Sequence, residues 1–421
     1  MIELQLDIPI GTDSADRIES FRVEGERLVR VVRRRDGTQA QSSVRLVDGV
    51  PKGTLSEQFD WCWLRATKPP RASGSEKEVR IADLFSGGGL MTLGAVEALR
   101  AVGLRGTPAM LLDVEPSAAK ACERNFDGAK VLTKKVEEVI DGAVGAKKTA
   151  TEKALVETVG TIDLLLGGPP CQGHSDLNNH TRRQDGRNEL AMRMARFCEL
   201  FQPKYVVLEN VRGILHDSKS VLSRIEANLR KLDYSVETVV AKAELLGVPQ
   251  RRHRVFLVAT KQADLNLEVT LRSLEVPSRT FAWACSDLLD KPDTGIDGAP
   301  VPSLTNKKRI DYLFENNVHD LPDSERPDCH RNGGHSYKSV YGRLWWDRPA
   351  QTITTGFRAV GQGRYVHPKR RRALTAHEAA RLQSIPDYYN FGDEKSTSVA
   401  TLIGNAVPPK LAYAVTLAAV R

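Results

Sequence analysis

Short apolar runs alternate with helical patterns over residues 79–261. The runs read VRIADLF, AMLLDVE, IDLLLGG, YVVLENV and RVFLVAT, and the segments between them, such as LMTLGAVEALRAVG and SAAKACERNF, carry apolar residues at helical spacing. Nearly continuous apolar strands that alternate with helices are typical of a sheet covered by helices on both faces. The pattern therefore predicts an α/β fold of the Rossmann-like kind.

The remainder of the chain divides into regions of different texture. Residues 1–66 read as short strands and turns, ending in DWCWLRAT, and predict a β-rich extension of unknown role. Residues 67–78 form a polar linker with Pro, Gly and Ser. Residues 262–346 are irregular and too long for a loop, so we expect a second, smaller domain there. Residues 347–421 complete this domain and return to the α/β domain through the helical patterns TAHEAARLQSI and PPKLAYAVTLAAV.

The composition is that of a soluble globular protein that acts in the cytoplasm. Hydrophobic residues make up 41% of the 421 residues, and neither a membrane span nor a signal-peptide pattern is present. The net charge of +8 is compatible with a polyanionic partner. The cysteines lack the paired spacing of a disulfide framework or a zinc site, so we expect no metal and a cysteine free for chemistry. They are Cys62, Cys122, Cys171, Cys198, Cys285 and Cys329.

A glycine turn and an acidic strand end indicate a cofactor site. In ADLFSGGGLMTL three glycines follow the first strand, where open α/β sheets bind cofactors, although a simple tight turn is an equally good explanation of the glycines alone. The next strand ends in LLDVEP and places Glu115 where a carboxylate can accept hydrogen bonds from ribose hydroxyls. Together they predict an adenosine-containing cofactor.

Candidate catalytic groups follow three other strands. Cys171 comes after two prolines in GGPPCQGHS, just past an apolar run, whereas a cysteine used only for packing belongs inside such a run. The alternative is a small hydrophobic residue in a strand-to-loop turn. Glu209 and Asn210 end YVVLENV, where a carboxylate is costly unless it is paired or has a task; the alternative is a surface turn. In GVPQRRHRVFLVA, alternation predicts that Arg252 and Arg254 lie on one face and converge on one group. A structural ion-pair ladder is the alternative.

From about Val79 to the C-terminus, the chain resembles the DNA cytosine C5-methyltransferase family of the bacterial restriction-modification type. The resemblance rests on segments that occur in the family's order: DLFSGGG, DVE, GGPPCQGHS, LENV, QRRHR, RPAQTITT and GNAVPP. It leaves only the irregular segment unmatched, and it implies the family's target-recognition domain at residues 262–346, which reads bases through the major groove of duplex DNA.

The resemblance implies a covalent mechanism. A cysteine thiolate adds to C6 of a flipped-out cytosine, C5 then attacks the methyl group of S-adenosyl-L-methionine, and loss of the C5 proton expels the cysteine. By resemblance Cys171 is the nucleophile, Glu209 contacts N3, Arg254 contacts O2, and Arg252 helps to hold the base or the loop.

The same resemblance assigns binding roles to further residues. It implies cofactor contacts from Phe85, Ser86, Gly87, Gly89, Leu90, Glu115, Pro169, Asn405 and Val407. It implies substrate contacts from Gln172, Ser175, Asn210, Gln250, Arg182 and Arg183, of which the arginines stand with Arg187 in a long polar segment that resembles the family's mobile active-site loop. The basic segment GFRAVGQGRYVHPKRRR is a further candidate for DNA contact, with a solvated charge run as the alternative.

Some positions depart from the family's pattern. Leu90 stands where the family usually has glycine, and His174 where it usually has phenylalanine. The acidic residue expected to face the cofactor adenine is not evident, and Glu137 or Asp141 are the candidates.

Three functions compete. The resemblance implies methylation of cytosine C5 at a specific sequence of double-stranded DNA, by a monomer associated with the nucleoid, in a restriction-modification or phage-defence system that includes a cognate restriction endonuclease or other defence proteins. The second is an RNA (tRNA) cytosine C5-methyltransferase, a branch that lacks this proline-cysteine-glutamine form of the motif. The third is a catalytically silent DNA-binding regulator, which should have lost Cys171, Glu209 or the arginines.

Overall fold

A computed structural model describes residues 17–71, 77–170, 190–216, 221–262, 265–331 and 339–421. Its main feature is a seven-stranded sheet with the order β6-β5-β4-β7-β8-β10-β9. The strands are β4 (Glu78–Leu84), β5 (Arg105–Asp113), β6 (Lys130–Thr133), β7 (Leu164–Gly167), β8 (Tyr205–Asn210), β9 (Ser235–Lys242) and β10 (His253–Thr260). The first five of these pair in parallel, and β10 runs antiparallel to β8 and β9. The Rossmann-like α/β fold predicted from the alternating runs is confirmed.

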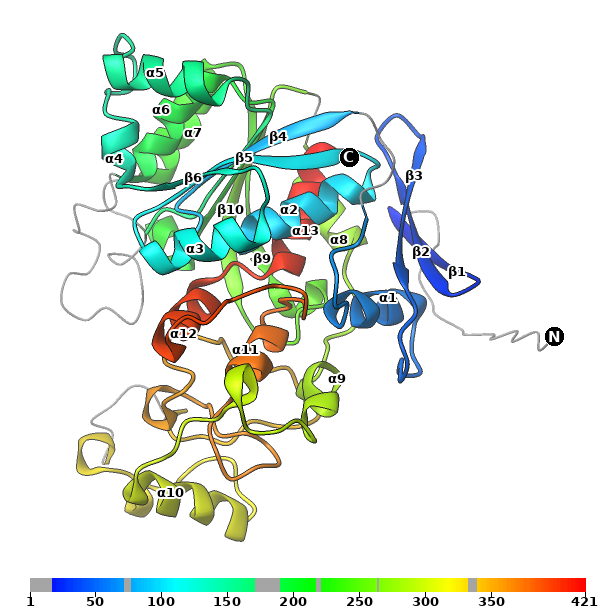
Figure 1. Ribbon diagram of the computed structural model, residues 1–421, viewed down its shortest axis with the longest axis vertical. Helices are drawn as coiled ribbons and strands as arrows, with labels where there is room; N and C mark the ends of the chain where they lie inside the picture. Colours follow the sequence, from blue (N-terminus) through cyan, green and yellow to red (C-terminus); the bar gives the residue numbers. More distant parts are fainter. Residues whose placement is uncertain (1–16, 72–76, 171–189, 217–220, 263–264, 332–338) are drawn as a thin grey trace.

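Helices cover both faces of this sheet, because its strands are apolar on both sides (Figure 1). One face carries α2 (Leu90–Ala101), α8 (Leu267–Ser273) and α13 (Pro409–Val420), and the other carries α4 (Val136–Val139), α5 (Ala150–Val159), α6 (Met192–Phe201) and α7 (Val221–Lys231). The pair α2 and α13 packs so closely that a Cβ at Gly94 would lie 2.2 Å from the carbonyl oxygen of Pro409. The C-terminal helix is therefore an integral layer of the α/β domain.

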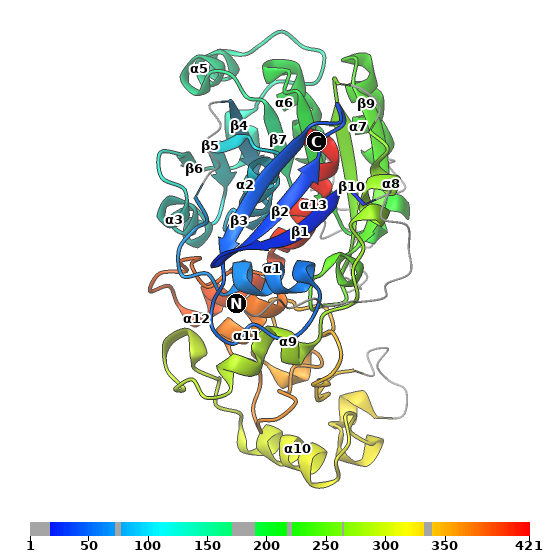
Figure 2. The ribbon, with the colours of Figure 1, turned by 90° about the vertical axis from the view of Figure 1, so that its right-hand side faces the viewer.

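The N-terminal region forms a small antiparallel sheet that lies beside α2 (Figure 2). Its strands are β1 (Glu19–Glu24), β2 (Arg27–Arg33) and β3 (Gln39–Arg45). The prediction of a further strand at DWCWLRAT is wrong, because this segment belongs to helix α1 (Leu55–Leu64). The Thr54 hydroxyl caps the helix by accepting from the amide of Glu57. Burial of Phe59 and the other aromatic residues against the sheet outweighs their preference for strands.

The lower part of the molecule in Figure 1 holds the irregular region, which we call the recognition region (residues 274–394). It contains α9 (Phe281–Cys285), α10 (Leu304–Glu315) and α11 (Ala376–Leu382). Its core is continuous with α3 (Pro116–Asn125) and α12 (Ser396–Asn405). The region therefore has no sharp border with the α/β domain. Short 3-10 helices occur at Arg212–His216, Ala243–Leu246, Ser286–Leu288, Gly295–Asp297, Asp323–Glu325, Asp328–His330 and Val360–Gln362.

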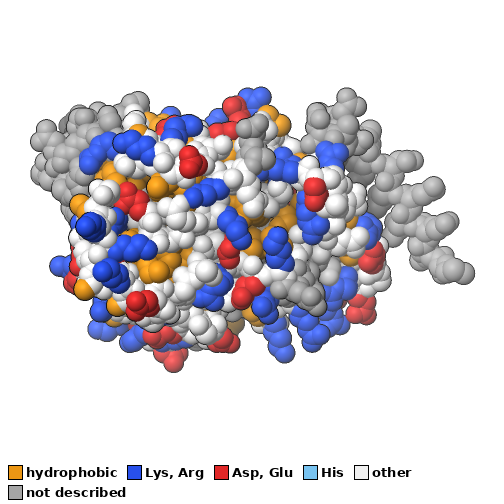
Figure 3. Space-filling view, turned by 90° about the horizontal axis from the view of Figure 1, so that it is seen from above, with side chains coloured by type: hydrophobic (Ala, Val, Ile, Leu, Met, Phe, Trp, Pro, Cys, Tyr) orange, Lys and Arg blue, Asp and Glu red, His pale blue; other side chains and the backbone are white. Residues whose placement is uncertain are grey.

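The surface seen from above the α/β domain carries Lys and Arg side chains spread over the face with Asp and Glu between them (Figure 3). The net positive charge is thus not gathered into one patch on this face. In the described part of the chain, no helix has the length and apolarity needed to cross a bilayer.

Candidate active site

A large cleft opens at the carboxyl ends of the parallel strands, between the sheet and the recognition region. It is lined by the segments that follow β4, β5, β7 and β8, by the start of β10, and by residues from the recognition region and from the turn before α13. Its volume of about 1490 Å³ exceeds the roughly 300–1,000 Å³ of a pocket for one small ligand. The cleft therefore has room for two ligands side by side.

The glycine turn after β4 forms one end of the cleft. Phe85 and Gly87 have φ angles of 62° and 51°, in the left-handed region that is strained for a side chain other than glycine. A Cβ at Gly87 would meet no atom within 4 Å, so the backbone here borders open space. The amide of Gly87 donates to Asp113 Oδ2 at 2.7 Å, and the amide of Glu115 donates to Asp113 Oδ1 at 2.9 Å. One carboxylate thus holds both halves of the cradle.

Most of the predicted cofactor residues line this cleft. They are Phe85, Ser86, Gly87, Leu90, Glu115, Pro169, Asn405 and Val407. Gly89 is the exception, because it is the N-cap of α2, and a Cβ there would lie 2.4 Å from the Phe126 ring. Its neighbour Gly88 lines the cleft instead, where the Tyr389 hydroxyl donates to its carbonyl at 2.5 Å. Leu90 lines the cleft although it replaces the family's glycine.

Glu209 and Arg254 meet at the centre of the cleft. The Nε of Arg254 lies 2.8 Å from Oε1 of Glu209. Both side chains are largely buried, with 16% of Arg254 and 13% of Glu209 exposed. Antiparallel pairing of β8 with β10 brings them together. A Cβ at Gly168 would lie 3.4 Å from Oε2 of Glu209, so Gly168 borders the carboxylate, and Pro169 and Pro170 line the same cleft. Because Cys171 is the next residue, the candidate nucleophile follows the segment that borders this carboxylate.

Arg252 and Arg254 both line the cleft and form contacts with different groups in the structure. Their convergence on one group of the substrate stays a prediction. Arg252 precedes the strand, is 3% exposed, and donates to the carbonyls of Ile353 (2.9 Å) and Gly404 (3.4 Å). It thereby ties the recognition region to the turn before α13, while Arg254 pairs with Glu209.

Gln250 and Asn210 make local contacts in the structure, and their contacts with the substrate stay predictions. Gln250 is fully buried; its amide donates to Leu382 and Gln383, and its carbonyl accepts from the amide of Ile353 at 2.7 Å. The side chain of Asn210 accepts from the amide of Val211 at 2.8 Å. Neither Gln250 nor Asn210 is among the described residues that line the cleft. Cys171, Gln172, His174, Ser175, Arg182, Arg183 and Arg187 lie outside the described residues.

Two carboxylates and one pair of hydroxyl groups that line the cleft were not predicted. Asp113 begins the quoted DVE segment and ends β5, and its position at a strand end was the available signal. Asp83 lies within an apolar strand; burial raises its pKa to about 7, although the Thr92 hydroxyl that donates to it at 2.6 Å acts in the opposite direction. Thr354 and Tyr365 share a hydroxyl–hydroxyl hydrogen bond of 2.8 Å on the recognition side of the cleft. Only the fold brings these two near the strand ends.

Neither candidate for the adenine-facing acid reaches the cleft in the described structure. Asp141 accepts from the Thr149 hydroxyl at 2.5 Å, beyond the helix α4 that carries Glu137. The cleft lining near the cradle includes Asp113, Glu115 and Ser117 instead.

The basic segment at residues 356–372 is largely engaged in internal contacts. Arg364 donates to the carbonyl of His319 and pairs with Asp320, and Arg371 pairs with Asp311 at 3.0 Å. Together with Arg372, which pairs with Glu378, three of the six Lys and Arg residues of the segment are therefore compensated by carboxylates of the recognition region.

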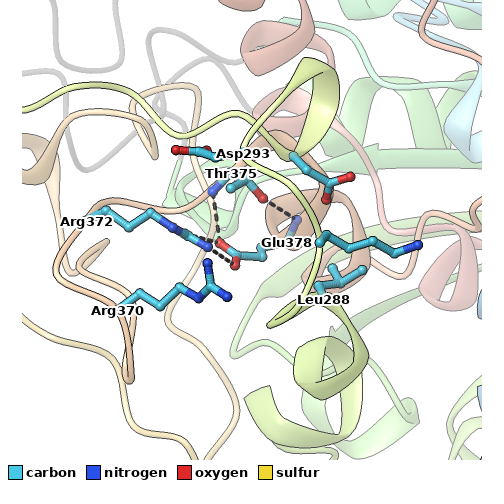
Figure 4. A pocket seen from close by; sticks show the side chains of 8 residues that line it. Leu288, Asp293, Arg370, Arg372, Thr375 and Glu378 are labelled. Carbon is cyan, nitrogen blue, oxygen red and sulfur yellow. Dashed lines mark hydrogen bonds and ion pairs between the residues drawn. The ribbon is translucent and has the colours of Figure 1, made fainter.

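A second, small pocket lies beside α11 (Figure 4). Arg372 forms two hydrogen bonds of 2.7 and 2.8 Å with the carboxylate of Glu378, and Thr375 and Glu378 form a capping box at the helix start. Because these side chains form hydrogen bonds with one another, we interpret the pocket as the surroundings of a structural ion pair. Among the described residues, no cluster of His, Cys, Asp and Glu could hold a metal ion.

Comparison with known proteins identifies the family. The family model for C-5 cytosine-specific DNA methylase matches residues 79–421. The chain belongs to this family. It is a DNA cytosine-5-methyltransferase, as the motifs predicted.

Individual relatives agree with this assignment. The chain is 45% identical over 405 residues to the Type II methyltransferase M1.BsuMI of Bacillus subtilis, covering 96% of this chain and 95% of the relative. It is 29% identical to the Type II methyltransferase M.Eco47II of Escherichia coli, covering 82% of this chain and 80% of that one.

Solved structures share the fold of the enzyme. One is a putative DNA modification methyltransferase encoded within a prophage in E. coli (TM-score 0.55, 22% identity, 81% of this chain and 98% of that one). Another is the methyltransferase EhMeth of Entamoeba histolytica (TM-score 0.57, 14% identity, 82% of this chain and 98% of that one).

Proposed function

We propose that the enzyme methylates C5 of cytosine within one specific sequence of duplex DNA, through a covalent bond between Cys171 and C6 of a flipped-out base. The observation that supports this most is the Glu209–Arg254 pair, which borders the segment leading into Cys171 inside a cleft large enough for a base and a cofactor. N3 and O2 of cytosine both accept hydrogen bonds, so Arg254 can donate to O2 and Glu209 can donate to N3 once its carboxyl group carries a proton.

The cradle fits S-adenosyl-L-methionine, which supplies the methyl group. Open space over Gly87, the exposed Glu115 and the lining residues Asn405 and Val407 suit a nucleoside whose ribose is held by a carboxylate. Asp113 holds the Gly87 turn and Glu115 in register with each other.

Each catalytic side chain has a distinct task in this proposal. Cys171 forms the bond to C6, while Glu209 holds a proton at N3 and so draws electron density from C6. Arg254 orients Glu209 and donates to O2. Arg252 acts through the backbone, by fixing the segments of Ile353 and Gly404 around the base.

The covalent step is tested with duplexes that carry 5-fluorocytosine at the target position. Fluorine leaves no proton to remove at C5, so the bond to the enzyme persists and a denaturation-resistant adduct forms. We expect the adduct with the natural enzyme and with the control Cys329→Ala, which removes an exposed cysteine, but not with Cys171→Ala. An adduct undiminished in Cys171→Ala would overturn the assignment.

The biological setting is proposed from the relatives, whose names describe them as Type II methyltransferases. We infer that this enzyme binds DNA as a monomer, acts on nucleoid DNA in the cytoplasm, and protects its recognition sequence from a cognate restriction endonuclease. Bisulfite sequencing of DNA from cells that express it should show methylation of cytosine at one sequence. Methyl transfer to tRNA and not to duplex DNA would favour the RNA alternative.

A further inference from the structure

The N-terminal unit (residues 17–65) contacts both halves of the molecule. Its sheet lies against α2 and α13 of the α/β domain, and its helix α1 reaches the recognition region (Figure 2). The family match begins only at residue 79, whereas the similarity to M1.BsuMI covers 96% of the chain. The unit is thus an addition to the methyltransferase fold, and its contacts indicate what it adds.

Its attachment to the α/β domain is buried and multivalent. Arg30 is 2% exposed and lies between the rings of Phe59 and Tyr413, with its carbon Cζ 4.8 and 4.7 Å from their centroids. Its Nη2 donates to Glu97 of α2 at 2.7 Å, and Tyr413 of α13 donates to Glu19. An arginine held by both stacking and a charged hydrogen bond has little freedom to move.

The carboxylate of Asp60 in α1 joins segments on both sides of the cleft. It accepts from Lys410 Nζ at 2.6 Å, and Lys410 lies in the first turn of α13, three residues after Val407 of the cleft lining. It accepts from Arg279 of the recognition region at 3.5 Å. A Cβ at Gly247, three residues before Gln250, would lie 3.2 Å from it.

Arg65, the C-cap of α1, reaches furthest into the recognition region. Its Nη2 donates to the carbonyls of Trp283 (3.0 Å) and Ala284 (3.1 Å) and to Asp287 (2.5 Å), while the guanidinium stacks on Trp61 at 3.9 Å. Burial and the nearby Arg381 lower the pKa of Arg65 to about 10, which still leaves it charged at neutral pH.

The contact continues through α11 and returns to α1. Arg381 lies 3.3 Å from Asp287 and 2.5 Å from Asp387, and the amide of Asp387 donates to the carbonyl of Leu64 at 3.0 Å. The result is a closed ring of contacts. A ring of this kind resists rotation of the recognition region better than a single ion pair, because one contact cannot break without straining the others.

We infer that the N-terminal unit is a brace that fixes the orientation of the recognition region relative to the catalytic cleft, and that Arg65 is a positioning residue for DNA methylation. The inference rests on the proposed function, in which bases read by the recognition region must be in register with the flipped cytosine. A recognition region held in the wrong orientation makes fewer of its base contacts, so the loss falls on formation of the complex with cognate DNA.

The test compares Arg65→Met, Arg65→Lys and the control Arg45→Ala, which removes a 76% exposed arginine of the same unit. We expect Arg65→Met to raise KM for the cognate duplex about tenfold, as coupling residues typically do, and to reduce discrimination against a duplex with one changed base. The maximal rate and the affinity for S-adenosylhomocysteine should stay near those of the natural enzyme. Arg65→Lys should restore most of the loss, and Arg45→Ala should have no effect.

Two further measurements keep the inference separate from folding and from the proposed function. Asp287→Asn breaks the same contact from the recognition side and should reproduce the KM effect. Amide hydrogen exchange over residues 281–288 should be faster in Arg65→Met and Asp287→Asn, with or without activity, and unchanged over α13. Unchanged KM and exchange in both variants would overturn the inference, as would a parallel loss of cofactor affinity. A natural enzyme that methylates no DNA would overturn the proposed function instead, while the exchange result would still decide whether the brace exists.

Discussion

At the scale of single residues, the pairing of Glu209 with Arg254 is the most informative contact. The sequence indicated that a carboxylate at this strand end needs a partner or a task, and the structure supplies a cation at 2.8 Å. The pair is preorganised before any substrate enters, so a base that reaches the cleft meets a guanidinium and a carboxyl group that are already oriented.

Replacement of Glu209 by Gln should reduce turnover far more than DNA binding. Gln keeps the size of the side chain but cannot hold a proton at N3 as a carboxylic acid does, so we expect kcat to fall by about 10² to 10⁴. Single-turnover rates and DNA Kd values measured on the same duplex check this. Glu226→Gln, which breaks a surface pair with Arg230 on α7, is the matched control. Equal losses in Kd and kcat would assign Glu209 a binding role only.

At the scale of elements, the loop from His367 to Arg372 folds around a fully buried histidine. Nδ1 of His367 accepts from the amides of Lys369 and Arg370 at 2.9 Å each, which requires an unprotonated Nδ1. Burial lowers the pKa of His367 to about 4; Glu378 opposes the shift, and nearby cationic side chains, with Arg372 first, add to it. The loop is therefore built for the neutral imidazole.

The variant His367→Asn should make stability less dependent on pH. The pKa of His367 rises from about 4 in the folded chain to about 6.5 on unfolding, so the unfolded state binds more protons between these values. The stabilising effect is complete above pH 6.5 and is lost as the pH falls towards 4. We expect protonation of His367 to lower the free energy of unfolding of the natural enzyme by about 2 kcal/mol when the pH falls from 7 to 5.

Urea unfolding of both proteins at the two pH values measures the difference. Asn retains an acceptor for the two amides but does not titrate. Other groups, including His377 with its raised pKa, titrate alike in both proteins and cancel. An equal loss of stability in the variant would contradict the account.

At the scale of the whole molecule, positive charge is divided between internal pairs and the cleft. Arg371 forms ion pairs with Asp311 and Glu315 of α10. Arg251, by contrast, is exposed and lines the cleft just before β10. The location of an arginine, and not the total charge of +8, decides whether it can meet a phosphate.

Binding of duplex DNA should weaken with salt, because each phosphate contact releases counterions. We expect Arg251→Ala to make the slope of log K against log salt concentration shallower by about 0.9, the contribution of one contact. Arg371→Ala should leave the slope unchanged. Fluorescence anisotropy over a salt series measures both, and a slope that changes only in Arg371→Ala would reverse the assignment of the two arginines.

The sequence by itself determined the elements and the chemistry that lies at their ends. Apolar runs predicted the strands β4, β5, β7, β8 and β10, and the glycines predicted the turn where Gly87 adopts a positive φ, because both signals are local. The Pro-Pro setting made Cys171 a candidate, and the resemblance to the family then predicted that it is the nucleophile.

Only the tertiary structure decided which partner each of these side chains contacts. Alternation placed Arg252 and Arg254 on one face of the strand. In the structure Arg252 donates to the carbonyl of Ile353 in the recognition region, and antiparallel pairing of β10 with β8 brings Arg254 next to Glu209. Helix α1 was mistaken for a strand because its aromatic residues favour strands locally, and burial against β2 outweighs that preference. The contacts of Arg65 span more than two hundred residues of sequence. Such long-range contacts leave no periodic trace in the chain, since they depend on how separate layers pack.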